Sequence, residues 1–251
     1  MAKLVTLGWD SLFDDAGATI TESGAASGFP SANGSDWLTW TSWKAGGSGA
    51  WRRASFASAR TCSYFAIAVH DLGTLTGTMT LDSSPDGTTW TTRATLAPSD
   101  DRPRFVLFAP VAALHWRVTL SAGASVGVVA AGPYLTIPNG QWVGETPHDL
   151  ARDHEALTTI SEAGHFLGRS LIRRGYSVSV TGEYLEPDWV TDYWLPFMIH
   201  AEVKPFFVVW PTPAANTPAR CLYCWLPGMP PRPQITAPRE MAVKFSARGI
   251  G

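Results

Sequence analysis

The chain has 251 residues, of which 45% are hydrophobic and 16% charged, and it contains 19 prolines and 23 glycines. This composition excludes a disordered chain and favours a turn-rich protein that forms one large β domain or two domains of ordinary size. The formal net charge of -2 offers no concentrated excess of Lys and Arg, so recognition of nucleic acid is not expected.

The cysteine content and the N-terminus predict where the protein is made. Three cysteines cannot form a disulfide framework, and the first residues lack the apolar run of a signal peptide. We therefore expect synthesis and folding in a reducing cytoplasm. No stretch reaches the roughly 18 to 20 consecutive apolar residues of a membrane span, so membrane insertion is not expected.

The first half of the chain contains short stretches in which apolar and polar residues alternate. A period of two is typical of strands with one buried face, and their natural closure is an antiparallel sandwich or jelly roll. The predicted strands are 62–70, 78–82, 88–95, 104–109, 114–120 and 126–135. Pro85-Asp86-Gly87 predicts a turn. The Gly/Ser/Ala-rich region 24–59 is predicted to form long loops pinned by tryptophans.

A segment of turn composition between about residues 138 and 150 indicates a domain boundary. We therefore predict two domains, 1–138 and 139–251. Glu186-Pro187-Asp188 predicts the start of one short helix, which Pro196 should end or kink. The strands predicted in this half are 176–184, 206–210, 221–226 and 241–247. The expected fold class is mainly all-β.

Three segments of the first half resemble a discoidin or galactose-binding-like domain. They are Thr41-Ser42-Trp43-Lys44-Ala45, Ala66 to Gly73, and Leu81 to Trp90 with its Ser-x-Asp-Gly-x-x-Trp element. The resemblance covers about residues 5 to 135 and implies a jelly-roll sandwich. In that family such tryptophans usually pack the sandwich, which implies structural roles for Trp43 and Trp90.

The second half is similar to a family of tail proteins from long-tailed bacteriophages. The similarity lies in Ser161 to Ser170 with Arg173-Arg174-Gly175, in Trp194-Leu195-Pro196-Phe197, in Pro205 to Trp210 and in Met241 to Gly249. It implies a minor tail or tail-tip protein of the virion, comparable to distal tail proteins that form a ring at the end of the tail tube. The implied partners are further copies of the chain, as a hexamer or alternatively a trimer, and the tail tube, hub and tail fibre.

A ring subunit needs aromatic and Arg-containing patches that become buried on assembly. The candidates for this subunit interface lie in the second half and are Arg169, Arg173, Arg174, Trp189, Trp194 and Trp210. Large aromatic side chains also fill cores, so core packing is the alternative for each tryptophan.

Sugars stack on exposed aromatic rings that loops present, so the sandwich could also touch host-surface glycans. The candidate glycan contacts are Trp37, Trp40, Trp51 and Arg52. A carbohydrate-binding module with no role in a ring is therefore the alternative function.

No constellation of residues predicts catalysis. The chain contains neither a Gly-x-Ser-x-Gly elbow nor a phosphate-binding Gly loop. The charged segment 148–155 matches no metal-ligand spacing, and Cys221-Leu222-Tyr223-Cys224 lacks a second pair. We expect no enzyme activity, no cofactor and no metal. Two alternatives stay open: a glycan-degrading enzyme with paired carboxylates, and a structural Ca²⁺ at Asp14-Asp15 or Asp100-Asp101.

Overall fold

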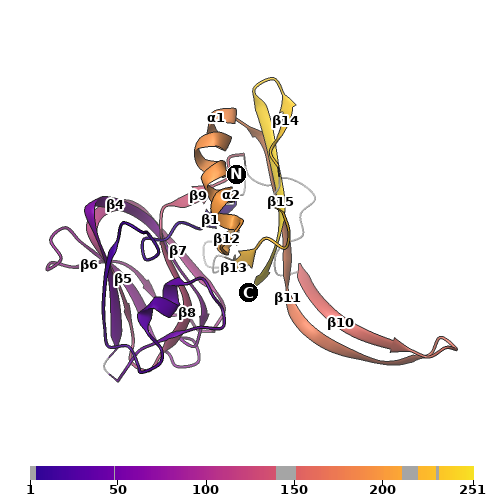
Figure 1. The fold of residues 1–251 in the computed structure, drawn as a ribbon, viewed down its shortest axis with the longest axis horizontal. Helices are drawn as coiled ribbons and strands as arrows, with labels where there is room; N and C mark the ends of the chain where they lie inside the picture. Colours follow the sequence, from indigo (N-terminus) through magenta and orange to yellow (C-terminus); the bar gives the residue numbers. More distant parts are fainter. Residues whose placement is uncertain (1–3, 48, 140–150, 211–219, 230–231) are drawn as a thin grey trace.

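A computed structural model describes residues 4–47, 49–139, 151–210, 220–229 and 232–251. The chain is mainly β and forms two antiparallel sheets, which belong to two separate units. A two-stranded arm projects from the second sheet (Figure 1). The expected fold class is confirmed, including the single short helical segment.

The first sheet curls into the N-terminal sandwich. Its strands follow the order β3-β8-β4-β7-β5-β6, with β2 paired to β4. They are β2 (Thr19–Ser23), β3 (Trp43–Lys44), β4 (Ala50–His70), β5 (Met79–Ser84), β6 (Thr91–Leu96), β7 (Arg104–Leu120) and β8 (Ser125–Gly132). The pairing of β4 with β7 is interrupted between Ser55 and Arg60, and such irregularities let long strands bend. The two halves of these strands therefore enclose one core, which includes Trp43, Phe65 and Trp116.

The first half of β4 corrects the sequence prediction, because residues 50–59 form a strand and not a loop. Ala50, Arg52, Ala54 and Phe56 are buried and alternate with more exposed neighbours. Two of the four inward positions hold alanine and one holds arginine, so the period of two is present in burial but hardly visible in hydrophobicity.

The turn after β5 has the chemistry that the Ser-x-Asp-Gly-x-x-Trp element suggests. Asp86 Oδ1 accepts hydrogen bonds from the backbone N–H groups of Thr88 and Thr89, and Gly87 adopts a φ of 76°. These backbone hydrogen bonds hold the pKa of the Asp86 carboxyl well below its usual range. Trp90 packs under the guanidinium of Arg117, whose Cζ lies 4.1 Å from the ring centroid.

The second sheet follows the order β10-β11-β15-β13-β12-β1-β9, with β14 paired to β15. Its strands are β1 (Thr6–Gly8), β9 (Tyr134–Thr136), β10 (Arg152–Ile160), β11 (Phe166–Leu185), β12 (Phe206–Trp210), β13 (Arg220–Trp225), β14 (Gln234–Ala237) and β15 (Glu240–Ile250). β1 and β9 come from the first half of the chain, so a cut at residue 138 does not separate the two sheets. The predicted boundary itself adjoins residues 140–150, which lie outside the described residues.

One helical segment covers the second sheet (Figure 1). It begins as α1 (Pro187–Trp189), continues as the π-helical turn η2 (Val190–Trp194) and ends as α2 (Leu195–Ala201). The helix does not end at Pro196. Immediately before this proline, Leu195 N–H donates to the carbonyl of Val190, five residues back, and this π-helical turn shifts the backbone hydrogen-bonding pattern where proline lacks an N–H. Trp194, Phe197 and Met198 are buried in the core of this unit.

A third apolar cluster joins the two units. Tyr64 and Phe105 of the sandwich stack with ring centroids 4.9 Å apart, and Phe207 of the second sheet packs 6.3 Å from Phe105. A Cβ added to Gly8 would lie 2.5 Å from the Phe105 ring, so only glycine fits there. The hydroxyl of Tyr223 in the second sheet donates a hydrogen bond to the backbone carbonyl of Trp37 in the sandwich, which adds a polar contact between the two units.

The buried His70 and the half-buried His200 predict a loss of stability in mild acid. Burial lowers the pKa of His70 and of His200 below the usual value, so both imidazoles stay neutral in the fold. Each Nε2 contacts a carbonyl, that of Arg102 at 2.8 Å and that of Pro205 at 2.9 Å. Below about pH 6.5 the unfolded chain takes up protons that the folded chain refuses, so the free energy of unfolding should fall from about pH 7 to pH 5.

Denaturant unfolding across this pH range measures the effect. The double variant His70→Gln, His200→Gln should have a flatter dependence, because its side chains do not titrate. An equally steep fall in the double variant would assign the effect to other groups.

Candidate functional site

The arm consists of residues 152–175, which include β10 and the first part of β11. Pairing of β11 with β15 begins only at Tyr176, so the described residues before it pair with β10 alone. The two strands run out from the second sheet as an isolated ribbon (Figure 1). A hydrogen-bonded turn between Ser161 and His165 closes its tip. The sequence predicted no strand in this range, although it gave the charged segment 148–155 and the interface candidates Arg169, Arg173 and Arg174 there.

The register of the ribbon sorts its side chains onto two faces, because residues opposite each other share a face. We define the basic face of the arm as Arg152, His154, Ile160, Phe166, Arg169, Leu171 and Arg174. It contains three arginines and no carboxylate. The opposite face holds Glu155, which pairs with Arg173 at 2.8 Å, and Asp153, which pairs with Arg248 at 3.4 Å.

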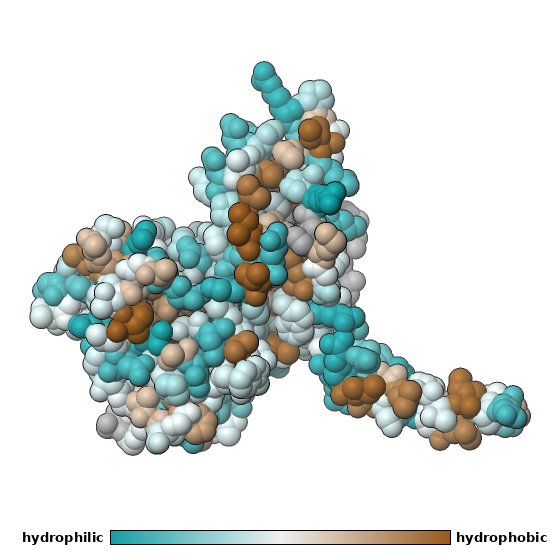
Figure 2. Space-filling view, viewed as in Figure 1, coloured by the Kyte–Doolittle hydropathy of each residue, from teal (hydrophilic) through white to brown (hydrophobic). Residues whose placement is uncertain are grey.

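Apolar side chains along the arm are open to solvent. Six of them are between 44% and 66% exposed: Leu157, Ile160, Phe166, Leu167, Leu171 and Ile172. Figure 2 shows apolar patches along this projecting ribbon, with no other part of the chain against them in this view. Exposed apolar patches mark interaction sites in soluble proteins.

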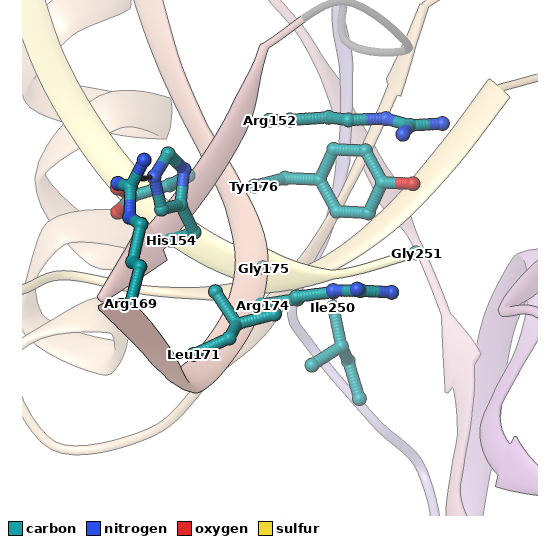
Figure 3. Close-up of a pocket in the computed structure, with 10 residues that line it drawn as sticks. Arg152, His154, Arg169, Leu171, Arg174, Gly175, Tyr176, Ile250 and Gly251 are labelled. Atoms are coloured by element: carbon teal, nitrogen blue, oxygen red, sulfur yellow. Dashed lines mark hydrogen bonds between the residues drawn. The ribbon is translucent and has the colours of Figure 1, made fainter. Parts of the chain in front are cut away.

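The base of the basic face is concave, with a volume of about 650 Å³. Arg152, Tyr176 and Arg174 project from it in the same direction, while Arg169 and His154 face each other (Figure 3). Arg169 Nη2 donates to His154 Nε2 over 2.6 Å. Among the described residues of the lining, Asp153 is the only one with a carboxylate side chain, and it is itself paired, so the site is electropositive.

The predicted interface residues have different environments. Arg169, Arg173 and Arg174 are exposed on the arm, whereas Trp189 and Trp210 are half-buried. Trp194 is 1% exposed and lies among Phe197 and Phe245. The structure therefore corrects the interface role predicted for Trp194, because its ring is enclosed by its own core. The six apolar arm residues were missed, since a ribbon with both faces exposed has no hydrophobic period.

The predicted glycan contacts also differ in their exposure to solvent. Trp37 is 3% exposed, and its Nε1 donates to Asp14. Arg52 is buried and donates to Ser31 Oγ, so neither side chain presents a free surface to a sugar. Trp51 is half-buried in β4. Trp40, by contrast, is 81% exposed and borders a hollow of about 550 Å³ with polar lining from Ser42, His70, Asp71 and Asp101.

Several titratable groups that the sequence offers as candidate ligands or reactive groups are buried or hydrogen-bonded within the fold. Within the described ranges no cluster of His, Cys, Asp or Glu could hold a metal ion, and residues 148–150 of the charged segment lie outside them. Asp101 is bonded to Thr74, and Asp100 to Arg104. Cys221 and Cys224 are buried free thiols whose pKa burial raises. Among the described residues no helix is long and apolar enough to cross a membrane.

No family model and no curated protein matches the chain. Solved structures align with about half of it. A pectin-binding carbohydrate-binding module is 21% identical, covers 46% of this chain and 89% of its own, and gives a TM-score of 0.39. A module from Clostridium perfringens in complex with GalNAc-β-1,3-galactose is 12% identical (49% and 100% covered, TM-score 0.39). The CBM32 of AlyQ in complex with 4,5-unsaturated mannuronic acid is 20% identical (49% and 96% covered, TM-score 0.39). Likenesses with TM-scores of 0.39 are too distant to assign a ligand to this chain.

Proposed function

We propose that this chain is a structural subunit of a larger protein assembly, held together by the arm. The observation that supports the proposal is an isolated two-stranded ribbon with six large apolar side chains in solvent. Such a ribbon is at best marginally stable alone in water, and contact with a partner would cover its apolar surface. In this proposal the protein acts by binding neighbouring subunits through complementary surfaces, and it carries out no catalytic step.

A phage tail tip is the assembly that we propose. The arm contains Ser161 to Ser170 and Arg173-Arg174-Gly175, two of the segments in which the chain is similar to tail proteins. A ring requires a contact in which one surface of each subunit meets a different surface of the next, and an arm on one side of the body suits such a contact. We propose a hexamer, or alternatively a trimer, in the virion, with tail tube, hub and tail fibre as neighbours and with the sandwich projecting outward.

Shortening the arm should abolish self-association. In the test variant, Asn-Gly replaces residues 156–172, so that a two-residue turn joins Glu155 to its register partner Arg173. Sedimentation velocity should show only monomer, while the free energy of unfolding changes by no more than about 1 kcal/mol, because the deleted parts of the two strands pair only with each other among the described residues. The matched control is Leu75→Ser, which removes an exposed apolar side chain from the sandwich. Unaltered assembly of the shortened chain would contradict the proposal, as would a wild type that stays monomeric at every concentration and is absent from virions.

Glycan binding by the sandwich is a second candidate, and the exposure of Trp40 beside a polar hollow favours it. An indole in this position can stack on a sugar ring, while the surrounding hydroxyl and carboxylate groups accept or donate hydrogen bonds. Most of the lining of this hollow comes from the sandwich, and Ile250 and Gly251, which also line the base of the basic face of the arm, border it as well.

Trp40→Ala should weaken glycan binding at least roughly tenfold, the loss expected when a stacking platform is removed. Affinity electrophoresis in gels containing host cell-wall polysaccharides measures the retardation of each variant. Trp51→Ala is the control, because its half-buried ring is outside the hollow. If the wild type binds no polysaccharide, or if Trp40→Ala binds equally well, glycan recognition at this site is wrong.

A further inference from the structure

The helical segment on the second sheet exposes a surface that matches the basic face of the arm. Leu195 and Ile199 are 51% and 59% exposed, and their spacing of four places them on one side of α2. Val203, which is 80% exposed, lies in the turn after the helix and continues this spacing. Phe197 and Met198 occupy the opposite, buried side. Figure 2 shows an apolar stripe over this helix.

Carboxylates flank this stripe. Asp188, Asp192 and Glu202 are exposed, and none of them forms an ion pair with any residue that the structure describes. We define the acidic stripe as Asp188, Asp192, Leu195, Ile199, Glu202 and Val203. It combines three negative charges with three apolar side chains, whereas the basic face of the arm combines three arginines with Ile160, Phe166 and Leu171.

We propose that the basic face of the arm of one copy binds the acidic stripe on the helix of the next copy. This inference rests on the proposed assembly function and names the surface that receives the arm. Opposite charges across an interface set register and suppress wrong partners, and the apolar side chains between them supply buried area.

The contact has to join different copies. The arm leaves the second sheet on the side away from the helix and extends from the body, so it does not reach its own acidic stripe (Figure 1). Each copy thus offers one donor and one acceptor surface that differ from each other. Repetition of such a contact gives a closed ring or a filament, according to the rotation between neighbours.

Charge reversal tests the pairing. The arm variant Arg169→Glu, Arg174→Glu and the helix variant Asp192→Arg, Glu202→Arg should each self-associate at least roughly tenfold more weakly, because like charges then oppose each other. A chain that carries all four substitutions should regain association, since the attraction is restored with its sign inverted. Arg173→Gln, on the opposite face of the arm, is the matched control and should change association little. Circular dichroism of each variant reports folding.

Disulfide trapping locates the contact independently. Two differently tagged pools, Leu171→Cys and Ile199→Cys, should form a mixed covalent dimer when combined and oxidised. The native cysteines Cys62, Cys221 and Cys224 are buried and do not compete. Leu171→Cys combined with Leu75→Cys on the sandwich is the control and should give no specific mixed dimer.

The outcomes separate the two proposals. If the shortened arm abolishes assembly but charge reversal is not rescued and no mixed dimer forms, the acceptor lies elsewhere and this inference is overturned while the assembly function stands. If the wild type never associates and no dimer is trapped, both proposals are wrong. Rescue together with the mixed dimer supports both.

Discussion

Trp194→Ala should lower the free energy of unfolding by about 3–5 kcal/mol, the cost of removing a fully enclosed large aromatic side chain from a core. Its ring lies 5.1 Å from Phe197 and 5.6 Å from Phe245, between centroids, and only 1% of the residue is exposed. The cavity would form between the helix and the sheet that it covers. Urea unfolding monitored by circular dichroism measures the change.

Trp194→Phe distinguishes packing from polarity. The indole Nε1 of Trp194 is buried without a hydrogen-bond partner among the described residues, so phenylalanine keeps much of the volume and removes an unsatisfied donor. We expect a loss of about 1–2 kcal/mol for this variant. If Trp194→Ala left the monomer equally stable and only prevented association, the tryptophan would belong to an interface and the core assignment would be wrong.

Phe207→Ala should destabilise the protein by a similar amount, about 3–5 kcal/mol, and should also uncouple its two units. Phe207 is fully buried, with its ring 5.1 Å from Tyr223, 6.3 Å from Phe105 and 6.5 Å from Trp37. Because this cluster joins the sandwich to the second sheet, its loss should split or broaden the thermal transition. Differential scanning calorimetry records both the midpoint and the number of transitions.

Tyr223→Phe is the control for the uncoupling. It keeps the ring and removes only the hydroxyl that bonds to the Trp37 carbonyl, so a loss of about 1–2 kcal/mol in a single transition is expected. A Phe207→Ala protein that still unfolds in one sharp transition would show that other contacts couple the units.

Much of the sandwich and of the second sheet could be predicted from alternation or apolar runs, because most strands outside the arm bury one or both faces. Strands β5, β8 and β12 follow apolar periods of two or continuous apolar runs that are visible without a structure. The first half of β4 was missed because three of its four inward positions are alanine or arginine. The arm was missed for the opposite reason: both faces are exposed, so burial imposes no pattern on them.

The candidate sites could be predicted only in part. Arg169, Arg173 and Arg174 were selected through a resemblance, and all three are exposed on the arm. Trp40 and Trp194 look equally suitable in a sequence, yet one is 81% and the other 1% exposed. What decides between them is tertiary packing, which the local sequence around a tryptophan does not encode.

The position of the first strand has a consequence for how this protein can vary. β1 and β9 are antiparallel partners, and Gly8 lies directly opposite Tyr134. The chain therefore leaves the second unit and returns to it at neighbouring points, which makes the whole sandwich an insertion into a single β-hairpin. Hairpin turns tolerate insertions well when the two ends stay close together. A different module could be carried at this position, provided that it covers Phe207 and Tyr223, while the arm and its helix remain unchanged.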